Sequence, residues 1–217
     1  MQENFDTALK SILTSEGFYT PSRGWTDDPV DNGGPTLAGV TYNEYCRYIG
    51  RPDLIRNDKN WDQSVKDALR AMPDEHIANY YRKVKWDVVR GDELPPGVDL
   101  AVCDVCVLHG PGKGRQFYRR VLGLGDSMKP FSDDDIRTVW TDNVNWDAVI
   151  EAIGEQRLQH YAAICARNPS QNRFLKGWTN RARRTTAQCC DLAPDRSGQS
   201  VPSTEVGRTD DHELVEV

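Results

Sequence analysis

The helix predicted at the start of the chain carries an acidic residue on its buried face. With a turn of about 100° per residue, one side of this helix is apolar. The apolar stripe consists of Phe5, Ala8, Leu9, Ile12 and Leu13. Glu16 lies only about 20° around the helix axis from Phe5, so its carboxyl group points toward the core. Gly17 follows at once and marks the end of the helix. The fold must therefore accommodate a carboxyl group at the edge of its core.

Two interpretations of Glu16 follow from the helix alone. A glutamate on an apolar stripe is often paired with a buried arginine, and it then serves only the fold. Burial and the negative end of the helix dipole also disfavour the charged form of a carboxyl group, which suits a proton donor. The segment that follows, residues 17–41, is rich in Gly, Pro and Asp. A polar loop next to a buried acid favours the second interpretation.

Three separated motifs occur in a fixed order along the chain. The first comprises Glu-Gly-x-Tyr at 16–19, Asp-Pro-x-Asp-x-Gly-Gly-x-Thr at 28–36 and Gly-Val-Thr at 39–41. The other two span residues 80–112 and 174–184. Together they resemble glycoside hydrolase family 108, the peptidoglycan N-acetylmuramidases. The third motif resembles the peptidoglycan-binding segment usually fused behind this catalytic module.

The chain departs from the family pattern in three places. Phe18 replaces a usual glycine, and about five extra residues around Pro21 to Trp25 lengthen the loop after Glu16. Leu108 and His109 stand where the family usually has a polar pair. We assign no function to those two positions.

The resemblance implies a lysozyme-like fold of the α+β class, mainly α. We expect an N-terminal catalytic helix over about 4–15, a small β-hairpin lobe around 35–41 and a helical remainder. The expected layout is a muramidase catalytic module over 1–92, a helical peptidoglycan-binding-like lobe over 93–190 packed on it, and an acidic disordered tail over 191–217. Capping residues and periodicity predict the other helices. They lie near 42–49, 61–71, 73–84, 100–108, 114–122, after Ser132, 146–167 and 172–186.

The resemblance also implies the roles of the site residues. Glu16 is the expected acid, Asp31 stabilises positive charge or activates water, and Thr36 holds that water. The expected substrate-binding residues are Tyr19, Asp28, Gly33, Gly34 and Trp178. The alternative for the loop is plain turn chemistry, for which Asp, Asn and Gly are typical. Asp28 precedes a proline and looks like a turn initiator, so Asp31 is preferred as the second acid.

Charge is unevenly distributed along the chain. The net charge of the 217 residues is −6, and residues 191–217 hold seven acids and two bases. The remaining body is nearly neutral, and we expect no nucleic-acid partner. The last predicted helix carries five bases and no acid, which suits either an anionic cell-wall polymer or a solvated helix face. Those bases are Arg173, Lys176, Arg181, Arg183 and Arg184.

Metal and phosphate sites are not expected. Cys103, Cys106 and His109 have a spacing that could present ligands along a helix, but they lie in an apolar run, which indicates a buried core helix. The stretch Gly-Pro-Gly-Lys-Gly-Arg at 110–115 lacks the order of a phosphate-binding loop and predicts a turn between helices. The six cysteines are expected as reduced thiols.

Two hypotheses of function remain. The first is a monomeric, cofactor-free endo-N-acetylmuramidase of the endolysin type, whose partner is the peptidoglycan glycan strand. The chain shows no signal peptide and no membrane-spanning run, so we expect synthesis in the host cytoplasm and action on the wall after release. The alternative is a non-catalytic peptidoglycan-binding protein. Glu16 distinguishes them, because a binder has no reason to bury a carboxylate there.

Overall fold

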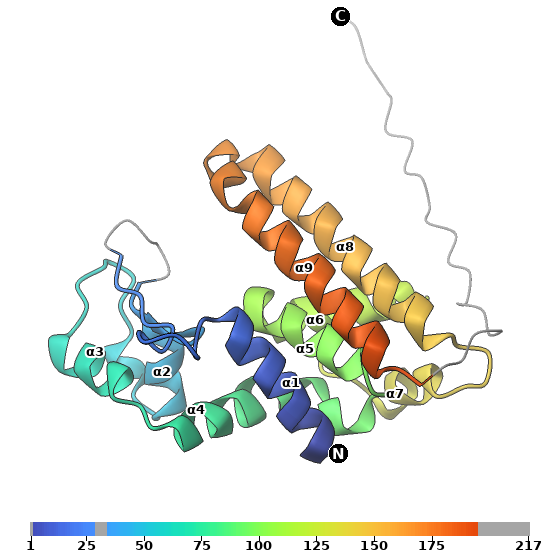
Figure 1. The fold of residues 1–217 in the computed structure, drawn as a ribbon, viewed down its shortest axis with the longest axis horizontal. Helices are drawn as coiled ribbons and strands as arrows, with labels where there is room; N and C mark the ends of the chain where they lie inside the picture. Colours follow the sequence, from blue (N-terminus) through green and yellow to red (C-terminus); the bar gives the residue numbers. More distant parts are fainter. Residues whose placement is uncertain (1, 29–33, 195–217) are drawn as a thin grey trace, which may run out of the picture.

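The computed structural model describes residues 2–28 and 34–194. The described part is mainly helical, with one two-stranded antiparallel sheet, which confirms the α+β, mainly α class (Figure 1). The longer helices are α1 Gln2–Ser15, α2 Tyr42–Tyr48, α3 Gln63–Arg70, α4 Asp74–Tyr80, α5 Val98–His109, α6 Pro111–Val121, α7 Asp133–Val139, α8 Trp146–Arg167 and α9 Asn172–Leu192. The strands are β1 Thr36–Leu37 and β2 Val40–Thr41, and the short helical turns are η1 Pro52–Leu54, η2 Tyr81–Trp86, η3 Asp87–Val89, η4 Gly91–Glu93 and η5 Pro169–Gln171.

The hairpin of β1 and β2 forms the small lobe together with α2 and α3. Thr36 pairs with Thr41, and Leu37 pairs with Val40. Thr41 then caps α2, because its hydroxyl accepts from the Glu44 amide while the Glu44 carboxylate accepts from the Thr41 amide. The capping box predicted from the sequence is therefore present.

Helix α5 lies at the centre of the fold. Residues 98–106 of this helix are all buried, as expected for a helix that is apolar on every side. Its two charged exceptions are Asp99 and Asp104, which are 2% and 1% exposed. Helices α6, α8 and α9 pack around α5, so a charged group in α5 must find its partners on those neighbours.

Helices α8 and α9 run side by side as an antiparallel pair that extends beyond the body of the molecule (Figure 1). The sequence predicts the bounds of α8 correctly. Helix α9 runs to Leu192, six residues beyond its predicted end near Thr186. Thr185 and Cys189 are buried, so tertiary packing continues the helix past the threonine pair despite their weak helix propensity. The first residues of the expected tail are therefore helical, and residues 195–217 lie outside the described part.

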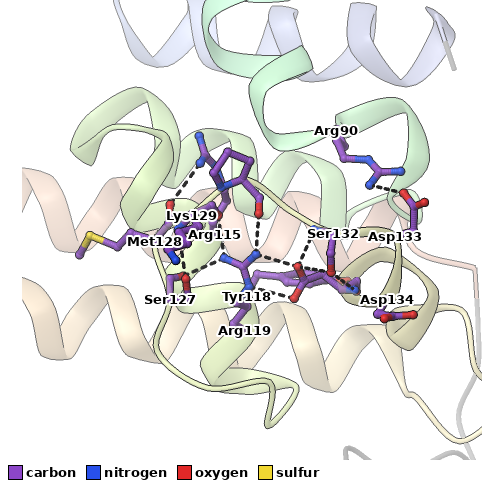
Figure 2. Close-up of polar contacts among 12 residues, drawn as sticks. Arg90, Arg115, Tyr118, Arg119, Ser127, Met128, Lys129, Ser132, Asp133 and Asp134 are labelled. Carbon is purple, nitrogen blue, oxygen red and sulfur yellow. Dashed lines mark hydrogen bonds and ion pairs between the residues drawn. The ribbon is translucent and has the colours of Figure 1, made fainter.

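A buried arginine fixes the loop between α6 and α7. Arg119 donates to both carboxylate oxygens of Asp135, at 2.8 and 2.7 Å, and to the carbonyls of Ser127, Lys129 and Pro130 (Figure 2). All three guanidinium nitrogens of Arg119 therefore have acceptors within residues 127–135. This network also orients Ser132, which caps α7 with Asp135 as predicted.

Two predicted helices differ in detail. The helix predicted over 73–84 changes character at Tyr81, where a π-helical turn, η2, replaces the α-helical spacing. Helix α6 begins at Pro111 rather than 114, because proline suits the first helical position. Among the described helices, none is at once long enough and apolar enough to cross a membrane. All six cysteines are free thiols.

Candidate active site

Glu16 directly follows the last residue of α1, Ser15, and is still held by the helix. Its amide donates to the carbonyl of Ile12 at 2.9 Å, and Gly17 then turns the chain with a φ of 71°. The amides of Gly17 and Phe18 donate back to Thr14 and Leu13, at 3.2 and 3.0 Å, as in a Schellman motif. The glycine predicted to end the helix does so, and the motif fixes where the Glu16 side chain leaves the backbone.

The loop after α1 returns to the helix end and brings the hairpin with it. Gly24 lies so close that a Cβ atom added to it would be 2.3 Å from the carbonyl oxygen of Glu16. The Gly24 carbonyl accepts from the Ala38 amide at 3.2 Å. The extra residues around Pro21 to Trp25 therefore connect the acid to the hairpin turn.

The hairpin turn contacts the carboxyl group itself. A Cβ atom on Gly39 would lie 2.8 Å from Cδ of Glu16 and 2.5 Å from the hydroxyl oxygen of Tyr81. Tyr81 is buried, and its hydroxyl donates to the Ala38 carbonyl at 2.6 Å. Burial and the neighbouring Glu16 charge raise the pKa of Tyr81 well above its usual value, so this hydroxyl stays neutral.

Arg181, from α9, pairs with the other side of the Glu16 carboxyl group. Its Nη1 lies 2.5 Å from Oε1 of Glu16, and its Nη2 lies 2.8 Å from Oδ1 of Asp104. The far oxygen of Asp104 lies 2.7 Å from Nη2 of Arg157 on α8. The four side chains form a chain of alternating charge that joins α1, α9, α5 and α8.

The two acids in this series of ion pairs, Glu16 and Asp104, differ in their exposure to solvent. The side chains of Asp104 and Arg157 are 1% and 2% exposed, whereas those of Glu16 and Arg181 are 16% and 11% exposed. Burial would raise the pKa of Asp104, but Arg181 and Arg157 outweigh it and hold the pKa below its usual value. Asp104 is thus a permanently charged, inaccessible anchor. Glu16 has a largely buried arginine partner, as in the alternative interpretation of the sequence, yet its side chain remains partly exposed.

The other predicted catalytic residues lie on the loop and hairpin. Thr36 is partly exposed, and its hydroxyl donates to the Gly34 carbonyl at 3.1 Å. The Thr36 and Thr26 backbones form a β-bridge, which ties the loop to β1. Asp28 is exposed at the end of the described loop. Asp31 and Gly33 lie outside the described residues.

The remaining predicted contacts are dispersed. Gly34 has a φ of 73°, and a Cβ atom there would meet the Trp61 ring at 2.4 Å, so an indole covers this glycine. Tyr19 is 62% exposed and packs edge-on against Phe18. Trp178 lies between Tyr161 and Phe174 in a row of rings, with centroids 5.4 and 5.7 Å apart. Because Tyr161 belongs to α8, this contact places Trp178 on the α9 face directed toward α8.

Sequence reasoning missed three groups around Glu16: Gly39, Tyr81 and Arg181. It grouped Arg181 with the exposed bases of the last helix, whereas the structure pairs it with the buried Asp104 and with Glu16. A signal was present, because an aspartate in the apolar run of residues 100–108 requires a buried cation. Nothing in the spacing of residues identifies which arginine supplies it.

The candidate metal ligands of α5 belong to the core. Cys103 and Cys106 are buried, and burial raises the pKa of the Cys106 thiol to about 12. His109 packs against the His160 ring, with centroids 4.9 Å apart. Within the described residues, no group of three or more His, Cys, Asp or Glu side chains has the arrangement of a metal site.

Comparison with known proteins relates the chain to one family of glycosidases. Residues 9–110, which include Glu16 and the hairpin, match the family described as glycosyl hydrolase 108. Among solved structures, SagA of Brucella abortus is similar, with 25% identity and a TM-score of 0.72 over 90% of this chain and 98% of that chain. The comparison with curated proteins gave no match. The likeness supports the lysozyme-like fold, and together with the match over residues 9–110 it supports a glycoside hydrolase of the family 108 kind, of the N-acetylmuramidase type that degrades peptidoglycan.

Proposed function

We propose that the chain is an endo-acting muramidase that cleaves the β-1,4 bond from N-acetylmuramic acid to N-acetylglucosamine, with Glu16 as the proton donor. The observation that carries this proposal is the position of Glu16. Its carboxyl group is fixed at a helix end, contacts the hairpin turn at Gly39 and is partly open to solvent. The neighbouring pair of Asp104 with Arg157, by contrast, is closed to solvent, with side chains 1% and 2% exposed.

In the proposed reaction, Glu16 gives its proton to the glycosidic oxygen as that bond breaks. The sugar ring gains oxocarbenium character, and Asp31 stabilises this charge or activates a water molecule held by Thr36. Water supplies the hydroxyl group of the new reducing end. The proton that this water releases replaces the one that Glu16 gave to the glycosidic oxygen. This chemistry needs no metal and no organic cofactor.

We also propose the arrangement of the chain for this task. A catalytic module over 1–92 contains Glu16 and the hairpin, and a helical lobe over 93–190 packs on it and contacts the glycan. The support for the lobe is the α8 and α9 pair, which extends past the body and carries the partly exposed rings of Phe174 and Trp178. Helix α9 continues two residues past the proposed boundary.

We propose that the biological role is that of a phage endolysin that reaches the wall after release and lyses the host. The test compares bacteria in which the chain is delivered to different sides of the cytoplasmic membrane. Chain directed to the outer side of the cytoplasmic membrane is expected to lyse the bacterium, while chain retained in the cytoplasm is not. Lysis by retained chain would contradict this role.

Purified peptidoglycan tests the activity directly. Mass spectrometry of the digest is expected to find new reducing ends on muramic acid. Glu16→Gln keeps the shape of the side chain but cannot donate a proton, and the loss of general acid catalysis is worth about 10² to 10⁴ in rate. New reducing ends on glucosamine, cut peptides, or a fully active and folded Glu16→Gln variant would contradict the proposal.

A further inference from the structure

The guanidinium of Arg181 is shared between two carboxylates with different exposure. One nitrogen lies 2.5 Å from the partly exposed acid, Glu16, and another lies 2.8 Å from the inaccessible acid, Asp104. Asp104 in turn contacts Arg157, whose Nε and Nη2 lie 3.3 and 3.2 Å from the hydroxyl group of Tyr161. Asp104 therefore keeps Arg181 in place whether or not Glu16 is protonated.

The consequence concerns the charge that develops on Glu16 during proton transfer. When Glu16 carries its proton, Arg181 still has Asp104 as a counter-ion, so no buried cation is left alone. When Glu16 gives up the proton, a negative charge appears 2.5 Å from a guanidinium that is already in place. A preorganised cation at the point where charge develops stabilises the transition state without rearrangement.

Resting on the proposed function, we infer that Arg181 is a positioning residue for Glu16, and that Asp104 and Arg157 hold Arg181 in place for this purpose. Arg181 lies outside residues 9–110, the part that matches the family model. The second lobe thus contributes a side chain to the catalytic centre and does more than bind the wall. The other ionisable group against Glu16 is Tyr81 of η2, which burial keeps neutral.

The test uses the full chain and soluble glycan strands prepared from purified peptidoglycan. In Arg181→Met, kcat is expected to fall about 100-fold, as for loss of a preorganised electrostatic group, with KM nearly unchanged. The basic limb of the kcat profile is expected to move to higher pH, because removal of a nearby cation favours the neutral form of an acid. Arg181→Lys keeps the charge but not the planar fork, so it is expected to restore the profile partly.

The matched control is Gln188→Ala. Gln188 also joins α9 to α1, by accepting from the Ser11 hydroxyl at 2.7 Å, but it does not contact Glu16. Its variant is expected to keep the wild-type kcat and pH profile. A change in kcat equal to that of Arg181→Met would show that any loosened contact between the two helices has this effect, and it would overturn the inference.

Other outcomes separate the inference from the proposed function. An inactive Glu16→Gln together with a wild-type kcat profile in Arg181→Met would overturn the role of Arg181 alone. An active Glu16→Gln would overturn both. If Arg181→Met does not fold, Arg181→Lys decides, since a wild-type profile there with Glu16→Gln inactive contradicts the need for the bridging fork.

Discussion

Gly39 lies so close to the Glu16 carboxyl group that a larger residue there would have to displace it. A single added Cβ atom would lie 2.8 Å from Cδ of Glu16 and 2.9 Å from its Oε2, closer than such contacts occur. The hairpin turn and the acid were brought together across 23 residues of sequence by the return of the loop at Gly24. The glycine in the third part of the motif therefore has a physical role at the acid itself.

Gly39→Ala is expected to lower the hydrolytic rate by at least about tenfold in protein that remains folded, because displacement of a catalytic group by about 1 Å can cost 10²-fold. The control is Gly50→Ala. Gly50 has a similar φ, 72° against 81°, but no atom lies within 4 Å of the added Cβ. Both variants carry the left-handed backbone cost of about 1–2 kcal/mol. Equal rates for the two, measured per folded molecule, would contradict the prediction.

Much of the fold could be predicted because local signals and burial agree. Asn145 caps α8, whose predicted and observed bounds coincide, and the boxes at Thr41 and Ser132 start α2 and α7. The end of α9 could not be predicted, since the buried Thr185 and Cys189 hold it by tertiary contacts.

The candidate site was predictable only in part. The helical stripe identifies Glu16 and shows that it faces inward, because periodicity fixes the face of a helix. Periodicity does not identify the partner on that face, and Arg181 is 165 residues away. Periodicity likewise does not identify the partner of Gly34, because its contact with Trp61 depends on the packing of α3 against β1.

Arg119→Met is expected to destabilise the protein by about 3–5 kcal/mol, because it leaves Asp135 as a buried charge without its partner. The Arg119 hydrogen bonds lower the pKa of Asp135 to about 2, which shows how strongly the pair favours the charged acid. Urea unfolding measures the change. Arg120→Met is the control, because its pair with Asp126 is 44% and 61% exposed and is worth only about 0–1 kcal/mol. A loss of stability as small as that of the control would show that the Arg119 network in Figure 2 does not stabilise the fold as expected.

The stability of the helical lobe is expected to fall in mild acid because of His109. Burial, and then the neighbouring His160, lower the pKa of His109 to about 4 from 6.5. Between those values the unfolded chain binds the extra proton, so His109 stabilises the fold fully above pH 6.5 and loses this effect as the pH falls toward 4. Lys113 and Arg157 also disfavour the charged ring, and Asp104 favours it.

The measurement is the free energy of unfolding in urea at several pH values. His109→Phe keeps a ring against Tyr161 but cannot titrate, so the decline from pH 6.5 to 4.5 is expected to be shallower than in the wild type. Comparing slopes is necessary because Asp99, whose pKa burial raises to about 6, contributes with the opposite sign. The exposed His76 is the control, and His76→Phe is expected to retain the wild-type slope. Parallel slopes for His109→Phe and the wild type would contradict the prediction.

The second acid is expected to be Asp31 and to act through water. Asp31→Ala should cost far more activity than Asp28→Ala, with Thr36→Ala intermediate, because the proposed reaction assigns the second acid to Asp31 and the placing of the water to Thr36, and gives Asp28 no chemical step. A water-based, inverting reaction requires carboxyl groups about 6.5 to 9.5 Å apart, whereas a direct nucleophile requires about 5 Å. NMR immediately after cleavage distinguishes the two, and α-anomeric muramic acid is the expected product. Retention of the β-anomer would make Asp31 the nucleophile, and an Asp28→Ala variant as damaged as Asp31→Ala would remove the reason to prefer Asp31.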